Sequence, residues 1–169
     1  MRGMIFIRSA TRADVELILE FIRGLAEYER APQSAVATAD DIIRDGFSEN
    51  PKFRVVIAEW EKQPAGFAFF FYNYSTWLGR PGIYLEDLYV RPEFRGRGIG
   101  KALLVHLAQI AVRENCYGMR WHVLDWNTPS IEFYESLGAK QLKEWIPMRL
   151  IGEELARLAA EGSLRRAGD

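Results

Sequence analysis

Apolar residues recur along this chain at two spacings, every second residue in some segments and every third or fourth residue in others. Alternation among β-branched and aromatic residues predicts strands, and the longer spacing predicts amphipathic helices. Strands are expected at 4–8, 53–60, 66–74, 83–90 and 119–124, with one or two more within 140–150. Helices are expected at 12–28, 39–46, 99–110, 128–137 and 152–160. This order predicts an α/β domain with a mixed central sheet.

Short polar motifs mark several of the helix starts. Thr11 and Thr38 are each followed three residues later by an aspartate, which resembles a capping box. Asn127 is a good N-cap for a helix that Gly138 would end. We expect one domain over residues 1–161 and a polar tail over 162–169.

Composition narrows the function classes. The 169 residues suit one domain, and Lys+Arg 22 against Asp+Glu 23 leave a net charge of −1. No basic field exists to hold nucleic acid generally, so the aromatic run 67–74 is expected to fill core and line a pocket. The apolar start, Met4 to Ile7, is far too short for a signal peptide or a membrane span. We therefore expect a cytoplasmic protein without membrane or nucleic-acid partners.

A strand, a glycine loop and a helix follow one another between Tyr84 and Leu104. The strand formers end before Pro92, and apolar residues from Ile99 onward repeat at helical spacing. The glycines 96, 98 and 100 therefore lie at a helix N-terminus, where backbone NH groups lack helical partners and the helix dipole favours an anion. Because glycine has no Cβ, a pyrophosphate can approach the main chain closely. The stretch predicts a phosphate-binding loop.

The glycine spacing excludes two common nucleotide loops. A dinucleotide-binding fingerprint needs a third glycine where Lys101 stands. A Walker loop needs a glycine where Arg95 stands and a hydroxyl where Ala102 stands. The stretch instead resembles the acetyl-coenzyme A loop of the GNAT acetyltransferases, Gln/Arg-x-x-Gly-x-Gly/Ala, through Arg95, Gly98 and Gly100.

Further motifs resemble one group within that superfamily, the spermidine/spermine (diamine) acetyltransferases. They are Leu-Ala-Glu-Tyr-Glu at 25–29, Asp-Gly-Phe at 45–47, Tyr-Leu-Glu-Asp at 84–87 and Leu-Asp-Trp-Asn at 124–127. Ser-Thr-Trp at 75–77 and Asp-Trp-Asn at 125–127 are more similar to the branch that acetylates thialysine. The resemblance implies a single-domain GNAT-like fold, acetyl-CoA as co-substrate, a small primary amine as acceptor, and a homodimer.

The resemblance also implies roles for individual residues. The main chain of Leu88, Tyr89 and Val90 would bind the pantetheine arm like an added strand. The pyrophosphate would be held by the loop residues Arg95, Gly96, Arg97, Gly98, Ile99, Gly100 and Lys101. Asn127, Ser130 and Tyr134 would meet the cofactor from its other side. Tyr28, Glu29 and Glu86 would face the amine substrate.

Two of these residues are candidates for proton transfer. Glu86 is expected to accept the proton of the amine, through water, while Asp87 on the opposite sheet face is expected to have a structural role as a salt-bridged carboxylate. Tyr134 is expected to meet the coenzyme A thiolate as it leaves, since it lies about two helical turns past Asn127.

Alternative functions share parts of this pattern. A protein N-terminus or lysine side chain is a second possible acceptor, and a non-catalytic acyl-CoA-binding module would need neither Glu86 nor Tyr134. His106 and His122 are too isolated for a metal site, so packing roles and no metal are expected.

Overall fold

The computed structural model describes residues 3–161, which belong to two compact units, Met1–His122 and Val123–Asp169. The tail expected at 162–169 lies outside the described residues. None of the described helices is long and apolar enough to cross a membrane.

The first unit is built on a five-stranded mixed sheet in the order β1-β2-β3-β4-β5. The first four strands pair antiparallel, and β4 pairs with β5 in parallel. The strands are β1 (Ile5–Ser9), β2 (Arg54–Trp60), β3 (Gln63–Ser75), β4 (Arg80–Val90) and β5 (Met119–Arg120). The expected α/β fold with a mixed central sheet is thereby confirmed.

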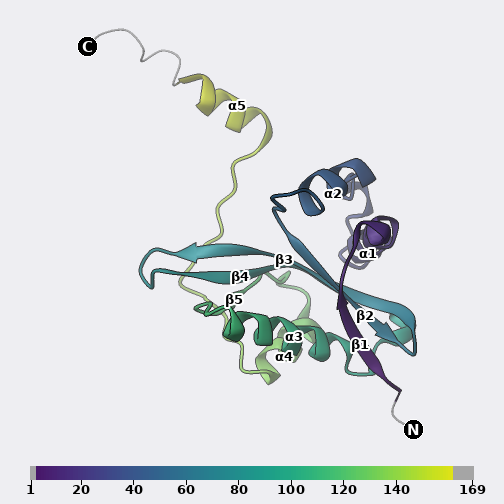
Figure 1. Ribbon diagram of the computed structural model, residues 1–169. Helices are drawn as coiled ribbons and strands as arrows, with labels where there is room; N and C mark the ends of the chain where they lie inside the picture. The colour runs from purple at the N-terminus through teal and green to yellow at the C-terminus, as the bar shows by residue number, and fades with distance from the viewer. Residues whose placement is uncertain (1–2, 162–169) are drawn as a thin grey trace. The chain divides into compact units, whose positions relative to one another are not determined.

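Three α-helices cover this sheet, α1 (Val15–Tyr28) and α2 (Ala39–Gly46) on one face and α3 (Ile99–Arg113) on the other (Figure 1). The α1 face holds an aromatic core in which Phe21 lies 5.3 Å from Phe67 between ring centroids. Leu103 and Leu107 of α3 are fully buried, as the repeat from Ile99 predicts. Short 3-10 turns lie at Arg12–Asp14, Pro32–Ser34 and Pro92–Phe94.

The second unit contains α4 (Thr128–Ser136) and α5 (Gly152–Glu161). Asn127 is the N-cap of α4, and its side-chain oxygen accepts the backbone NH of Ser130 at 3.4 Å. Both helices lie where the apolar spacing predicts them.

Two strand predictions are wrong. Only Met119 and Arg120 of the segment 119–124 pair with β4, opposite Ile83 and Tyr84. The pairing stops just before a β-bulge in β4, and bulges bend and twist a strand away from its neighbour. No strand forms within 140–150. An extended segment becomes a strand only where its backbone groups find a ladder partner, and no described strand pairs beyond β5.

Candidate active site

The glycine loop has the conformation that a phosphate cradle requires. Gly96 and Gly98 have φ of +74° and +81°, a left-handed region that side chains disfavour. A Cβ added at either position would meet no atom within 4 Å, so the space beside the main chain is open.

Gly98 is also the N-cap of α3 and has no side-chain cap. The first backbone hydrogen bond of the helix runs from the Ala102 NH to the Gly98 carbonyl at 3.0 Å. The NH groups before Ala102 therefore have no partner within the helix. The positive end of the helix dipole lies at this same N-terminus. An anion fits this position.

Two arginines bring positive charge to the loop. The Arg95 guanidinium lies 4.9 Å from the centroid of the Tyr28 ring, and its Nε donates to the Val90 carbonyl at 2.9 Å. The Arg97 guanidinium lies 5.1 Å from the Trp60 ring. Among residues 3–161 neither arginine forms an ion pair with a carboxylate. Stacking on aromatic rings holds these charges in place without neutralising them.

The strand that leads into the loop has one unpaired edge. β4 pairs with β3 along nearly its whole length, but it pairs with β5 only at Ile83 and Tyr84. From Leu85 to Val90 the second edge of β4 has no strand partner among the described residues. Such an edge can take an extended ligand or peptide as an added strand.

Glu86 occupies a β-bulge in the same strand. Leu85 pairs with Phe70 and Asp87 pairs with Phe69, so Glu86 has no partner residue on β3. Its side chain is exposed. Because directly paired residues share a face, Asp87 lies with Phe69 on the face covered by α1 and α2.

Asp87 is an unusual carboxylate. Burial raises its pKa to about 7, and the negative charges of Glu86 and Glu29 add to this rise. No hydrogen bond or ion pair to the Asp87 carboxylate occurs among the described residues. Burial also raises the pKa of Glu29, at the end of α1. The salt-bridged structural role expected for Asp87 is therefore wrong, and three carboxylates lie near one another beside the bulge.

The structure brings the predicted residues of the first unit together. Tyr28 and Glu29 end α1, Glu86 to Val90 lie on β4, and Arg95 to Lys101 lead into α3. Tyr28 and Tyr89 both contact Arg95, with the Tyr89 ring 5.8 Å from its guanidinium. Asn127, Ser130 and Tyr134 lie on or beside α4 in the second unit, where the Tyr134 ring is 5.4 Å from that of Phe133.

A model of the Acetyltransferase (GNAT) family matches residues 18–139, which include the glycine loop and β4. The chain belongs to this family. It is 39% identical over 168 residues to the thialysine N-epsilon-acetyltransferase of Sus scrofa, covering 93% of this chain and 98% of that protein. It is also 39% identical to the human spermidine/spermine N(1)-acetyltransferase-like protein 1, covering 92% of this chain but 24% of that protein.

Solved structures agree with the fold. An integron cassette protein from V. cholerae superposes with a TM-score of 0.77 at 29% identity, covering 94% of this chain and 98% of that one. The chain is thus an acetyl-CoA-dependent N-acetyltransferase of the GNAT type.

Sequence reasoning missed two features of this site. The raised pKa of Asp87 depends on burial and on a bulge, and neither is visible in an alternating apolar pattern. His122, expected to pack, forms a 2.8 Å hydrogen bond through Nδ1 with the Tyr84 hydroxyl, next to the end of the β4–β5 pairing.

Gly98→Ala is expected to weaken acetyl-CoA binding by about tenfold or more, since a hydrogen bond to a charged group is worth roughly 1.5–3 kcal/mol. The added Cβ would occupy the open space in which a phosphate approaches the main chain. The measurement is KM for acetyl-CoA at saturating amine. Gly79→Ala is the matched control, because Gly79 also has a left-handed φ, +64°, and open space beside it. Equal effects of the two changes would mean that Gly98 contributes backbone conformation alone.

Proposed function

We propose that this enzyme transfers the acetyl group from acetyl-CoA to a primary amine of a small molecule, a thialysine-like amino acid or a diamine, by direct attack in a ternary complex. The observation that carries this proposal is the group of carboxylates Glu29, Glu86 and Asp87 beside the bulge, next to an electropositive loop. Carboxylates favour a cationic acceptor, and a basic loop favours the anionic cofactor. The thialysine N-epsilon-acetyltransferase relative supports the same acceptor class.

The residues of the loop and of β4 fit acetyl-CoA. The loop from Arg95 to Lys101 would hold the pyrophosphate, and the unpaired edge at Leu88, Tyr89 and Val90 would hold the pantetheine arm. Asn127 and Ser130 would contact the cofactor from α4. When bound, acetyl-CoA supplies an acetyl thioester, which is reactive toward a neutral amine.

The chain must remove a proton from the amine. An alkylammonium with a pKa near ~10.4 loses its proton at pH 7 at a cost of about 4.6 kcal/mol. Glu86 accepts this proton, through water, because its side chain is exposed at the bulge. Asp87, whose pKa burial raises to about 7, follows it in the strand and can itself exchange a proton near neutral pH.

Tyr134 donates a hydrogen bond or a proton to the leaving sulfur. Tyr134→Phe is expected to slow turnover by roughly tenfold or more, since positioned acids commonly contribute more than this. The fold and the KM for acetyl-CoA should stay near their parent values, because only a hydroxyl is removed. Steady-state kinetics measure both constants.

Tyr117→Phe serves as the control for the Tyr134 prediction. It removes a hydroxyl that donates to the Asn73 side chain at 3.1 Å, away from the glycine loop. If Tyr134→Phe turns over as fast as this control, Tyr134 has no role as an acid.

The proposed acceptor is tested by following release of free thiol from acetyl-CoA with thialysine, lysine, spermidine, putrescine and a short peptide. Release with one of the small amines would support the proposal. The amine that works would show whether the acceptor is a thialysine-like amino acid or a diamine. Release with the peptide alone would replace it by a protein acceptor. Cofactor binding without thiol release would replace it by an acyl-CoA-binding module.

We further propose that the protein acts as a cytoplasmic homodimer, as its family resemblance implies. Sedimentation equilibrium of the purified chain measures the mass directly against 19.4 kDa for one chain. A mass equal to that of one chain at micromolar concentration would contradict the dimer.

A further inference from the structure

A cavity lies in the first unit, away from the residues of the glycine loop. Its volume is about 380 Å³, which is within the range of small-molecule sites. It is bounded by the end of β1, the segment that joins α2 to β2, the start of β2, and the C-terminal half of α3. None of the residues assigned above to acetyl-CoA or to the amine lines it.

The position of this cavity on α3 makes it a distinct site. His106, Ile110 and Arg113 line it, whereas the glycine loop precedes Ile99. At 1.5 Å per residue, these side chains begin roughly 10–20 Å along the helix axis from Ile99. A ligand here would not occupy the space in which the loop holds a pyrophosphate.

The lining combines an apolar floor with basic groups. The apolar members are Ala10, Phe47, Pro51, Phe53, Val55, Val56, Phe70 and Ile110. The polar side chains are those of Ser9, Arg54, His106 and Arg113. No carboxylate lines the cavity, so nothing in its wall opposes an anion.

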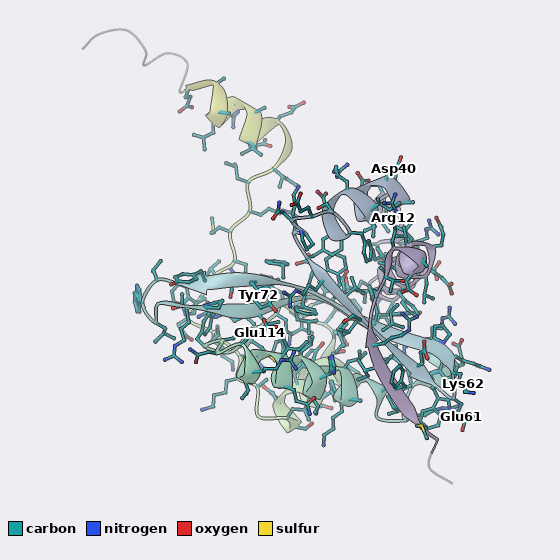
Figure 2. The ribbon with its side chains drawn as sticks, viewed as in Figure 1. Arg12, Asp40, Glu61, Lys62, Tyr72 and Glu114 are labelled. Carbon is teal, nitrogen blue, oxygen red and sulfur yellow. The ribbon has the colours of Figure 1, made fainter. Side chains whose placement is uncertain are left out.

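Of the two arginines in the lining, Arg54 forms an ion pair with a carboxylate and Arg113 does not, among the described residues. Arg54 donates to the Tyr72 hydroxyl at 3.0 Å and lies 3.3 Å from Glu114, and the Tyr72 hydroxyl also donates to Glu114; Figure 2 labels both Tyr72 and Glu114. Arg113 forms no ion pair among the described residues. Burial, together with the nearby positive charge of Arg113, lowers the pKa of the His106 imidazole. Arg113 is therefore the cation left for a ligand, and neutral His106 can donate one hydrogen bond.

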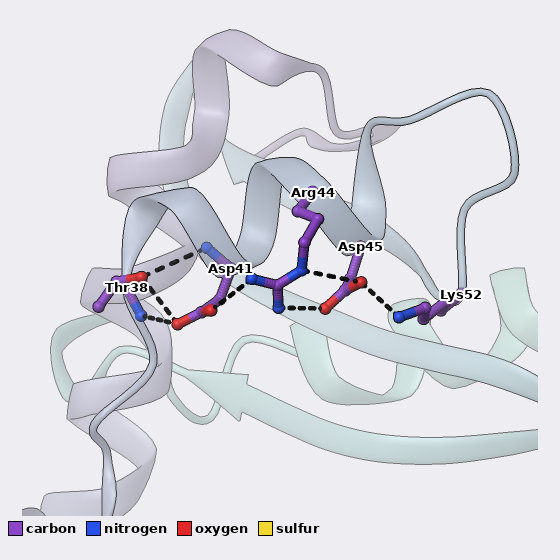
Figure 3. A network of polar contacts seen from close by, with 5 residues as sticks. All are labelled: Thr38, Asp41, Arg44, Asp45 and Lys52. Atoms are coloured by element: carbon purple, nitrogen blue, oxygen red, sulfur yellow. Dashed lines mark hydrogen bonds and ion pairs between the residues drawn. The ribbon is translucent and has the colours of Figure 1, made fainter.

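The part of the wall that the segment after α2 forms is held in place by a polar network. Thr38 caps α2 through Asp41, Arg44 bridges Asp41 and Asp45, and Asp45 also binds Lys52 at 2.6 Å (Figure 3). The Lys52 backbone NH donates to the Asp45 carbonyl at 2.7 Å, which closes the 46–51 segment.

Phe53 then stacks on Phe69, with their ring centroids 4.1 Å apart. A Cβ at Gly46 would lie 2.4 Å from the Phe53 ring, so the ring can pack against the main chain here only because residue 46 is glycine. The network also pairs the carboxylates of Asp41 and Asp45 with Arg44 and Lys52.

We propose that this cavity binds a small amphipathic monoanion, a carboxylate that carries an aromatic or branched apolar group. The apolar group packs against Val56, Phe70 and Ile110, and the carboxylate faces Arg113, with His106 and Ser9 as further donors. A bare inorganic anion would leave the apolar lining in contact with water, and a cation would be repelled by Arg113. Both are therefore expected to bind more weakly than an amphipathic anion.

The proposal is tested with 4-phenylbutyrate added to the isotope-labelled full chain without acetyl-CoA. Amide shifts are expected at residues 46–56 and 106–113, and not at 95–101. A ligand of this size should bind with a Kd in the low millimolar range. The alcohol 4-phenylbutanol and a trimethylammonium analogue of the same length are the neutral and cationic probes, and both should bind at least about tenfold more weakly.

Arg113→Gln identifies the cation. It should weaken binding of 4-phenylbutyrate by about tenfold and leave binding of the alcohol unchanged. Arg23→Gln, at an exposed arginine on α1, is the matched control and should change neither. Both variants should retain acetyl transfer, since neither residue belongs to the proposed active site.

Absence of shifts at the cavity, equal binding of alcohol and carboxylate, or unchanged affinity in Arg113→Gln would each overturn the proposal. The test reads binding without turnover, so its outcome is independent of whether the proposed amine is correct.

Discussion

Glu86→Gln is expected to lower kcat/KM for the amine by about 100-fold or more at pH 7. Loss of a positioned proton acceptor commonly costs 10²–10⁴-fold. The glutamine fills the same space at the exposed bulge, so KM for acetyl-CoA should stay near its parent value. The activity should recover partly at high pH, where more of the amine is already neutral. Rates measured from pH 6 to pH 10 at saturating acetyl-CoA show both effects.

Glu61→Gln is the control for Glu86→Gln. Glu61 lies in the β2–β3 turn, labelled in Figure 2, and contributes nothing to the glycine loop or the bulge. It should leave the rate and its pH dependence unchanged. If Glu86→Gln behaves in the same way, Glu86 is not the proton acceptor, and Asp87 becomes the carboxylate to test.

Asp87→Asn is expected to stabilise the protein above pH 7 while impairing catalysis. The pKa of Asp87 is raised from 3.8 to about 7, so the folded state holds this proton more tightly than the unfolded state does. Stability attributable to Asp87 therefore falls as pH rises from about 4 to about 7, by at most about 4 kcal/mol. Asparagine removes this penalty, and the variant should gain most above pH 7 and nothing below pH 4.

Chemical denaturation at pH 4, 6 and 8 measures the difference in unfolding free energy directly. Asp40→Asn, at an exposed position on α2, is the control without burial, and its change in unfolding free energy at pH 8 should be much smaller than that of Asp87→Asn. A constant difference between Asp87→Asn and the parent across this pH range would mean that Asp87 does not titrate as the structure implies.

Most helices and the first four strands could be predicted because their determinants are local. Thr38 and Asp41 form the expected capping box, with the Asp41 carboxylate accepting the Thr38 backbone NH at 2.9 Å. Alternation over 53–60 and 66–74 defines β2 and most of β3. The strand predictions failed at 119–124 and 140–150, where the outcome depends on whether a distant ladder partner exists.

The candidate site also has features that local sequence determines and features that depend on distant residues. The glycine turn at Gly96 and Gly98, at the start of α3, could be predicted because three glycines precede an apolar helical repeat, and both residues have a left-handed φ. That this loop binds phosphate stays a prediction. Stacking of Arg95 on Tyr28 joins residues 67 positions apart, so no local pattern indicates it. The state of Asp87 follows from a bulge and from charges on another helix, which only the folded chain brings together.

The unpaired edge of β4 also affects how the enzyme should be handled. Backbone groups along this edge have no strand partner among the described residues and can pair with the same edge of another molecule, which is a common first step of aggregation in β proteins. Pantetheine bound as an added strand would cover that edge. Acetyl-CoA should therefore slow aggregation of the purified enzyme in storage, because it blocks edge-to-edge association between chains. This effect is separate from any gain in unfolding free energy.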